Sequence, residues 1–520
     1  MPTGAPMHAA FRRVHVAALV LCAVFLPWST ALLSMAQMLL VANWLVGGLV
    51  RGDLRQCLRD GFTTAPVLVF LSFLGLHIVG LAWTSPEGMA WGMDLVRILA
   101  PVLTFGAVLA GSPPLEKHEL RLILLMGAWS VVASTVVCLI MYDPVPGGYR
   151  ELSRFISHIR LALLLCFAVV VLLYHRGPWW LTTVHVAAAA WAVYMLDRLG
   201  SIQGFAILAV IGAVMLWRWV RTVKPVARHA VRGVLLVAPV VVVGFLVNAL
   251  DRYYQLPVPE LSGWGEYTAG NEPYTFDATN PQMENGHHVW AWVALGEVER
   301  TWALRSDRPL DGPDGRGRPL RGTLLRYLTS TGARKDSAAM MALTDEEVRA
   351  IEGGRHNVLQ GKRSKLAERF DEVMFEIGQY RAYGRADGHS VAMRLEFLRA
   401  GLAIARDNWA FGVGTGDTKP AFAAQYERMG STLAPEWRYR AHNEYLTLAI
   451  SFGVFGLLWC LFACWWPAYT SGVWRYPLFI AWAVIFGISC LTDDTIETQA
   501  GATFFGLYYG LLVFGRRATR

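Results

Sequence analysis

The sequence predicts an all-α polytopic membrane protein with about twelve transmembrane helices and a large, mixed but mainly helical loop domain outside the bilayer. Three observations support this fold class. Hydrophobic residues make up 54% of the 520 residues and charged residues only 17%, whereas soluble proteins carry roughly 25% charge. The apolar residues fall in long runs, and the charges are concentrated in one central stretch. This composition argues against a soluble, disordered or fibrous protein.

The charge distribution defines the loop domain. Residues 251–445 hold 25 Lys and Arg and 27 Asp and Glu, a net charge of −2. The other 325 residues hold 22 basic and 12 acidic residues, a net charge of +10, and the two values sum to +8. The basic excess lies in short loops between apolar runs, where it sets membrane orientation and does not indicate nucleic-acid binding.

A spanning helix needs roughly 20 mostly apolar residues. The sequence offers twelve such stretches, about nine in residues 1–250 and about three in residues 446–520. They lie near 14–30, 32–50, 65–83, 95–110, 120–141, 157–174, 179–196, 202–219, 232–250, 446–467, 474–492 and 499–515.

The loops alternate in charge, which predicts the orientation of the spans. If the N-terminus is cytoplasmic, the inner loops carry basic residues such as Arg12, Arg51 and Arg55. The short outer loops then carry acids, namely Glu87, Asp94 and Asp143 and, near the C-terminus, Asp493, Asp494 and Glu497. This pattern follows the positive-inside rule. We therefore expect both termini in the cytoplasm and residues 251–445 on the outer face.

Local patterns predict several elements of the loop domain. Residues 251–290 contain many Pro and Gly and read as irregular. Residues 344–347 form a capping-box pattern that opens a short helix, and residues 362–383 and 390–408 show amphipathic periodicity. The stretch 412–417 resembles a phosphate-binding loop but lacks the Lys-Ser/Thr pair, so a tight turn after a helix is the favoured interpretation.

Cysteine usage and acidic motifs argue against metals and cofactors. The seven cysteines all lie outside residues 251–445, and no zinc-like spacing occurs. The chain contains no Asp-x-Asp motif, which removes support for a common type of metal-dependent nucleotide-sugar site. We expect no metal and no other cofactor.

Some arginines break the orientation rule because they lie at the outer boundary. Arg160 enters the sixth predicted span, and Arg198 follows the seventh. Arginine at a membrane boundary is costly unless it reaches the interface or pairs. A group of them suggests an anionic ligand on this face, and anchoring to lipid headgroups is the alternative.

The junction between the loop domain and the tenth span combines residues that suit catalysis. His442, Asn443 and Glu444 are consecutive, and Arg438 and Arg440 precede them. A histidine at this position can act as a base near neutral pH, and arginines can hold a phosphate with two hydrogen bonds. The alternative is a polar cap at the start of a spanning helix.

Several motifs in this region resemble the bacterial O-antigen ligase and O-antigen polymerase superfamily. They are a helix that begins at Arg394, the turn Gly412-Val-Gly, the run His442-Asn-Glu-Tyr-Leu and the later pair Phe452-Gly453. Asp197-Arg198 resembles the family's Ser-Arg element, with Asp in place of Ser. About twelve spans with a long, late outer loop also match, although residues 254–390 form a longer insertion than is typical of this family.

The resemblance implies transfer of a glycan from a polyprenyl-diphosphate carrier to an acceptor hydroxyl at the periplasmic face of the bacterial inner membrane. It implies neither metal nor nucleotide sugar. His442 would be the catalytic residue, and Asn443 and Glu444 would lie near the acceptor. The residues that would bind the diphosphate are Arg198, Arg394, Arg160, Arg440 and Arg438.

Several functions remain open at this point. Ligation of O-antigen to lipid A-core, O-antigen polymerisation and protein O-oligosaccharyl transfer share one mechanism, and ligation is slightly preferred. The acceptor is then a hydroxyl of lipid A-core, of another glycan or of a protein. A transporter or flippase for an anionic lipid-linked substrate is the alternative of another class, although transporters usually show repeats and polar groups at the membrane midplane. A sensor is less favoured because no cytoplasmic loop is long enough for an output domain.

Overall fold

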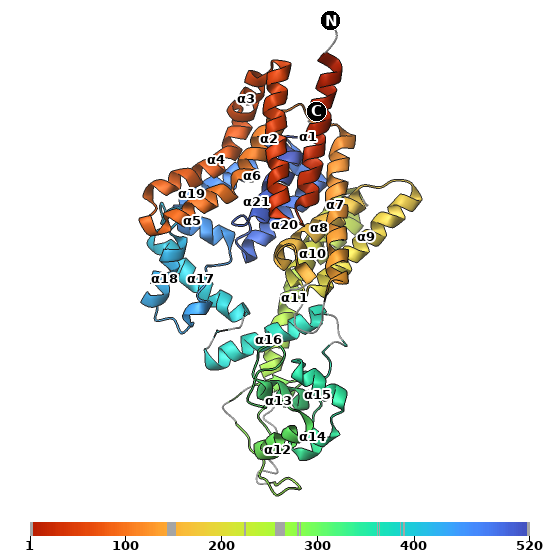
Figure 1. The fold of residues 1–520 in the computed structure, drawn as a ribbon, viewed down its shortest axis with the longest axis vertical. Coiled ribbons are helices and arrows are strands. Elements are labelled where there is room, and N and C mark those ends of the chain that lie inside the picture. Colours follow the sequence, from red (N-terminus) through yellow and green to blue (C-terminus); the bar gives the residue numbers. More distant parts are fainter. Residues whose placement is uncertain are drawn as a thin grey trace. The chain divides into compact units, whose positions relative to one another are not determined.

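The computed structural model describes residues 4–142, 152–222, 225–254, 266–277, 280, 282–360, 362, 365–384, 386–387 and 390–516. Within these residues the regular secondary structure is almost entirely helical, and the strands form one short hairpin (Figure 1). The chain divides into two compact units. The first contains residues 1–141, 152–218 and 394–520, and the second contains residues 142–151 and 219–393.

The first unit is a bundle of long apolar helices. Its N-terminal helices are α1 (Gly4–Phe25), α2 (Thr30–Arg51), α3 (Leu54–Thr63), α4 (Ala65–Val79), η1 (Gly80–Trp83), α5 (Pro86–Ile98), α6 (Ala100–Ala110), α7 (Lys117–Ile140), α8 (His158–Tyr174), α9 (Trp179–Arg198) and α10 (Ile202–Trp219). Its C-terminal helices are α17 (Ser390–Asp407, in this unit from Arg394), α18 (Thr418–Arg428), η4 (Pro435–Trp437), α19 (Glu444–Thr470), η5 (Val473–Arg475), α20 (Pro477–Thr492) and α21 (Gln499–Val513).

Packing within this unit joins segments that are distant in sequence. Helix α21 packs against α6, α19 against α4, and α20 against α8. Arg12 on α1 donates from Nε to Glu119 Oε1 on α7 at 2.9 Å. Glu119 also forms a capping box with Glu116 that begins α7, because a carboxylate at this position accepts otherwise unpaired backbone N–H groups. The C-terminal helices therefore complete a core that the N-terminal helices begin.

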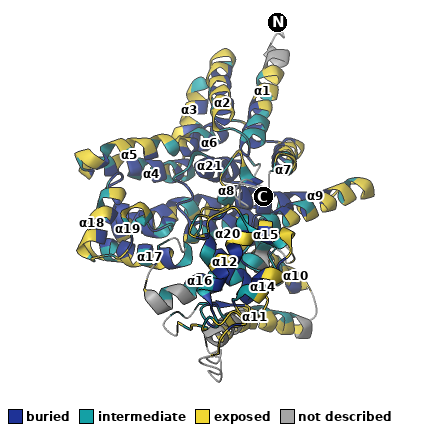
Figure 2. Cartoon of the chain, turned by 60° about the horizontal axis from the view of Figure 1, so that its bottom comes forward, coloured by how far each residue is buried: buried dark blue, intermediate teal, exposed yellow. Residues whose placement is uncertain are grey.

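Eight helices among the described residues are long and apolar enough to cross a membrane. Two shorter apolar helices are His158–Tyr174 and Pro477–Thr492. Figure 2 shows exposed residues along the outer faces of helices such as α2 and α9, and on α2 these include Met35, Met38 and Leu49. Exposed apolar faces of this extent suit contact with lipid. The fold is a helical membrane protein, and the count of about twelve spans stays a prediction.

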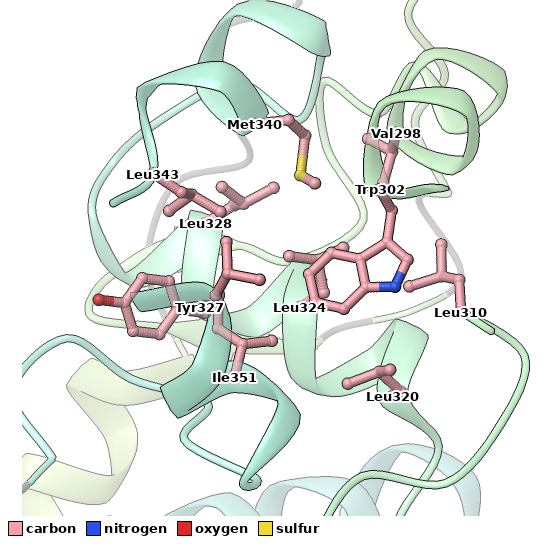
Figure 3. Close-up of a cluster of buried hydrophobic side chains, with 11 residues drawn as sticks. Val298, Trp302, Leu310, Leu320, Leu324, Tyr327, Leu328, Met340, Leu343 and Ile351 are labelled. Carbon is pink, nitrogen blue, oxygen red and sulfur yellow. The ribbon is translucent and has the colours of Figure 1, made fainter. Parts of the chain in front are cut away.

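The second unit contains a small helical core. Its elements are η3 (Val220–Thr222), α11 (Pro225–Tyr254), β1 (Met283–Glu284), β2 (His287–His288), α12 (Leu295–Arg305), α13 (Leu320–Ser330), α14 (Ser337–Ala342), α15 (Asp345–Glu352) and α16 (Lys365–Tyr383). Strands β1 and β2 pair antiparallel, with Met283 opposite His288. Trp302 on α12 and Tyr327 on α13 are buried among aliphatic side chains from the neighbouring helices (Figure 3).

Several predictions for the loop elements are confirmed. The capping box of Thr344 and Glu347 begins α15, and the amphipathic stretches form α16 and α17. The division into 1–250, 251–445 and 446–520 depends on the placement of a membrane and stays a prediction.

Candidate active site

His442 lies in an unusual backbone conformation immediately before α19. Its φ is 47°, in the left-handed region that non-glycine residues rarely adopt. Asn443 follows as the helix cap: its Oδ1 accepts from Leu446 N at 3.0 Å, and its Nδ2 donates to Leu491 O at 3.0 Å. The positive φ of His442 is a strained conformation, which costs on the order of 1–3 kcal/mol and is often found at functional sites. The alternative interpretation of this stretch as a helix cap therefore holds for Asn443, while His442 lies outside the helix.

The His442 ring has one nitrogen held by a carboxylate and one nitrogen open. Nδ1 lies 3.4 Å from Asp493 Oδ1, and the side chain is 36% exposed. The Phe397 ring lies 5.8 Å away, centroid to centroid. The described residues provide no hydrogen-bond partner for Nε2. A histidine in this arrangement can exchange a proton with a substrate through Nε2 while Nδ1 stays oriented.

The loop between α20 and α21 carries three acids, Asp493, Asp494 and Glu497, and brings Asp493 to this histidine. Asp493 and Asp494 are buried, with 6% and 5% exposure. Asp494 Oδ1 accepts from Thr447 Oγ1 on α19 at 2.8 Å, and Glu444 on α19 accepts from Ile496 N in the loop at 3.0 Å. These contacts fasten the acid loop, residues 493–497, to the first turn of α19.

Two predicted arginines join this cluster through ion pairs. Arg160 on α8 pairs with Asp493 and donates from Nη2 to Asp494 O at 2.9 Å. Arg440 pairs with Glu497, and its Nη2 lies 3.9 Å from Asp494 Oδ2. Buried charges need such partners. The acids therefore balance the charge of both guanidinium groups before any ligand is bound.

The structure places the other three predicted arginines differently. Arg394, on α17, is exposed and is near enough to His442 to affect its titration. Arg438 pairs with Glu427 on α18 and donates from Nε to Leu433 O at 2.9 Å. Arg198 is the last residue of α9, and its buried Nε has no hydrogen-bond partner in the described part of the chain. No described contact brings Arg198 to His442.

Burial and charge set the titration of the site. Burial lowers the pKa of His442 below 6.5; the Asp494 carboxylate opposes this effect, while Arg394, Arg440 and Arg160 add to it. The imidazole is therefore mainly neutral at pH 7. Burial raises the pKa of Glu497 to about 7, against the opposing effect of Arg440.

The acid loop is a part of the site that the sequence patterns did not predict. Asp493, Asp494 and Glu497 were interpreted only as markers of an outer loop. Three acids within residues 493–497, between two apolar helices, were a usable signal, because acids at the end of spanning helices need cationic partners. No group of three or more His, Cys, Asp or Glu side chains arranged for a metal ion is found among the described residues.

The glycine-rich stretch after α17, residues 412–417, packs against α19, the helix that follows His442. Val413 N donates to Ile450 O at 2.8 Å and Gly414 N donates to Ser451 O at 2.9 Å, so this stretch runs against the backbone of α19. Gly453 interrupts α19 with φ 67°. The predicted tight turn is confirmed, and the stretch contacts α19 instead of forming a phosphate loop.

These features define a class: a helical membrane protein with a buried ionic cluster around a strained histidine at the end of its helices. A family model described as O-antigen ligase matches residues 355–461. This match confirms the resemblance found in the sequence, and it covers residues 355–461. The matched segment contains Arg394 and residues 438–444, whereas Arg160, Arg198 and the acid loop lie outside it. No curated protein matches the chain.

Proposed function

We propose that this protein transfers a glycan from a polyprenyl-diphosphate carrier to an acceptor hydroxyl at the periplasmic face of the inner membrane, with lipid A-core as the acceptor. The family domain at residues 355–461 supports glycan transfer in general. The observation that carries the proposal is the His442 ring, with Nδ1 3.4 Å from the Asp493 carboxylate and Nε2 open.

His442 acts as the general base in this proposal. The Asp493 carboxylate favours the tautomer with its proton on Nδ1, which leaves the lone pair of Nε2 available. As the acceptor oxygen bonds to the anomeric carbon of the donor, its proton moves to Nε2. The bond between that carbon and the diphosphate oxygen breaks, and the lipid diphosphate leaves with the electron pair. Proton transfer of this kind typically contributes about 10²–10⁴-fold to the rate.

The arginines stabilise the leaving diphosphate in different ways. Arg160 and Arg440 are paired with acids, so they supply oriented N–H groups and little net charge. Arg394 is exposed near His442, and Arg198 retains an unused Nε donor within the described residues. We therefore propose that Arg160 and Arg440 position the phosphates, and we keep Arg394, Arg438 and Arg198 as further candidates for stabilising the leaving diphosphate.

The identity of the acceptor is a separate part of the proposal. O-antigen polymerisation and protein O-oligosaccharyl transfer use the same bond changes at the anomeric carbon. Mass spectrometry of the glycoconjugates from a deletion strain separates them, because each reaction leaves a different unglycosylated acceptor. Loss of glycan from lipid A-core alone is the result that we expect.

The test is transfer by the purified, reconstituted full-length chain with a polyprenyl-diphosphate-linked glycan. His442→Ala should lower transfer by about 10²–10⁴-fold. His442→Gln can hydrogen-bond an acceptor but cannot take its proton at neutral pH, so it should be as impaired as Ala. His118→Ala is the matched control, because His118 is exposed and pairs with Glu116 at the start of α7.

Two results would contradict the proposal. Near-normal transfer by His442→Ala, with normal donor binding, removes the base from the mechanism. Recovery of most activity in His442→Gln shows that His442 only orients the acceptor.

A further inference from the structure

A pocket lies beside the ionic cluster, between α18 and the segment that leads to His442. Its volume is about 640 Å³, within the range of small-ligand sites. Helices α18, α5 and α19, all of the first unit, lie together in this region (Figure 1). The lining residues are Lys419, Phe422, Ala423, Ala424, Glu427, Pro435, Arg438, Tyr439 and Arg440.

The charges of the lining leave one positive charge unbalanced. Arg438 pairs with Glu427, and Arg440 pairs with Glu497 of the acid loop. Lys419, which is exposed, has no ion-pair partner in the described part of the chain. The pocket therefore presents a single available ammonium group together with two guanidinium groups whose charge is already compensated.

Trp91 of α5 holds the two cations in place. Lys419 Nζ lies 3.5 Å and Arg440 Cζ lies 5.2 Å from the centroid of its ring, distances that allow cation–π attraction. The Trp91 Nε1 atom is buried without a hydrogen-bond partner among the described residues. The ring thus fixes Lys419 at the pocket, where no described acid forms an ion pair with it and the carboxylates of Glu497 and Asp94 act on it only from a longer distance.

The remaining lining is apolar or aromatic. Phe422, Ala423, Ala424 and Pro435 form much of the wall, and Tyr439 is 49% exposed. Aromatic and apolar walls suit the C–H faces of a sugar ring, while a few fixed polar groups set its orientation. One unbalanced cation matches one anionic group. A diphosphate, with a charge of about −2 or more, would exceed that single compensating charge.

We infer that this pocket binds a sugar ring that carries one carboxylate, with Lys419 as the ligand of the carboxylate. The inference rests on the proposed function, because it makes the acidic sugar part of the glycan donor or of the acceptor. It differs from the proposed diphosphate site, which contains the anomeric leaving group near His442.

Direct binding to the purified full-length chain tests this inference without turnover. The probes are glucuronate, glucose as the neutral analogue, and inorganic diphosphate, with dissociation constants measured by ligand-observed NMR. Lys419→Met keeps the side-chain stem and removes the charge, so it should weaken glucuronate binding about tenfold, the size of one charge-assisted hydrogen bond. Lys419→Arg should retain glucuronate binding. Lys117→Met, at an exposed lysine of α7, is the control and should change nothing.

The outcomes separate the possible ligands. Two results overturn the inference. In the first, Lys419→Met binds glucuronate as well as the wild type does. In the second, Lys419→Met loses as much affinity for diphosphate as for glucuronate. If saturating lipid-linked glycan displaces glucuronate, the acidic sugar belongs to the donor; if it does not, the sugar belongs to the acceptor. If Lys419→Met weakens glucuronate binding but His442→Ala transfers glycan at the normal rate, the assignment of this pocket holds and the proposed function is rejected.

Discussion

At the scale of single residues, His442 is controlled by charges from four segments of the first unit. Asp493 and Asp494 belong to the acid loop, Arg394 to α17, Arg160 to α8 and Arg440 to the segment before α19. Each charge affects how easily the imidazole accepts a proton. The segment that carries His442 is therefore only part of the site.

The pH dependence of transfer follows from these charges. A base must be neutral, so kcat/KM should rise with pH through the pKa of His442 and be constant above roughly pH 6.5. Burial lowers this pKa, and Arg394 lowers it further, whereas Asp494 raises it. Arg394→Ala should therefore raise the pKa and move the acid limb of the profile to higher pH. Asp494→Asn should move the same limb to lower pH.

The measurement is kcat/KM between pH 4.5 and 8 for the wild type and both variants, a range that brackets the ordinary histidine value of about 6.5. Equal displacement of the two variants in one direction would indicate a general structural change. An acid limb that moves in neither variant would mean that another group is titrating.

Arg160 and Arg394 should differ in their effect on stability. Arg160→Ala leaves Asp493 buried without its arginine, a change that typically costs about 3–5 kcal/mol. Arg394 is exposed, so Arg394→Ala should alter the free energy of unfolding by less than about 0.5 kcal/mol and still impair transfer. Thermal unfolding in detergent, together with transfer by the folded fraction, distinguishes the two. Equal stability loss in both variants would contradict this assignment.

At the scale of elements, the kink of α19 is the feature that shapes the site. Gly453 has φ 67°, and a Cβ there would collide with the backbone of Ala410. Gly412 has φ 70°, and its Cβ would collide with the backbone at Phe452. Two backbone segments thus cross so closely that only glycine fits at each side. The pair Phe452-Gly453, used in the sequence only as a family motif, has this physical reason.

The kink gives an element-scale prediction. Gly453→Ala should destabilise the protein by more than about 1–2 kcal/mol, because a side chain is disfavoured at positive φ and would also overlap Ala410. Gly212→Ala on α10 is the control: no atom lies within 4 Å of a Cβ there, so alanine should be neutral or slightly stabilising in this helix. The measurement is the unfolding temperature of each variant, and we expect a lower value for Gly453→Ala than for Gly212→Ala. Equal values would show that an alanine side chain can be accommodated at the crossing.

At the scale of the whole molecule, the orientation of the chain in the membrane can be tested by labelling. Glu346, on α15, and Arg55, on α3, are both exposed. In a cysteine-free background, Glu346→Cys should react with a membrane-impermeant thiol reagent in spheroplasts, whereas Arg55→Cys should react only after permeabilisation. This expectation rests on the alternation of basic and acidic loops. The reverse pattern would invert the topology and move the site to the cytoplasmic face.

Much of the architecture was predictable because local rules determine it. Apolar length identifies the helices, so the predicted stretches fall largely on helices, although the stretch 95–110 covers the end of α5 and all of α6. The start of α15 at Thr344 could be predicted for the same reason, since a capping box depends only on residues within one helical turn. The partners of Arg160 were not readable, because the residues that it contacts in the acid loop lie more than 300 positions away along the chain.

The sequence by itself determined that this is a helical membrane protein, which residues are candidates for chemistry, and that it resembles the O-antigen ligases. Composition and apolar runs suffice for the first point, and short motifs for the others. Only the tertiary structure decided which candidates meet. It placed Asp493 beside His442, gave Arg160 and Arg440 acidic partners, and left Lys419 without an ion-pair partner within the described residues. The reason is physical: the state of a charge depends on all groups that surround it in space, and helix packing, which brings those groups together, joins residues without regard to their order in the chain.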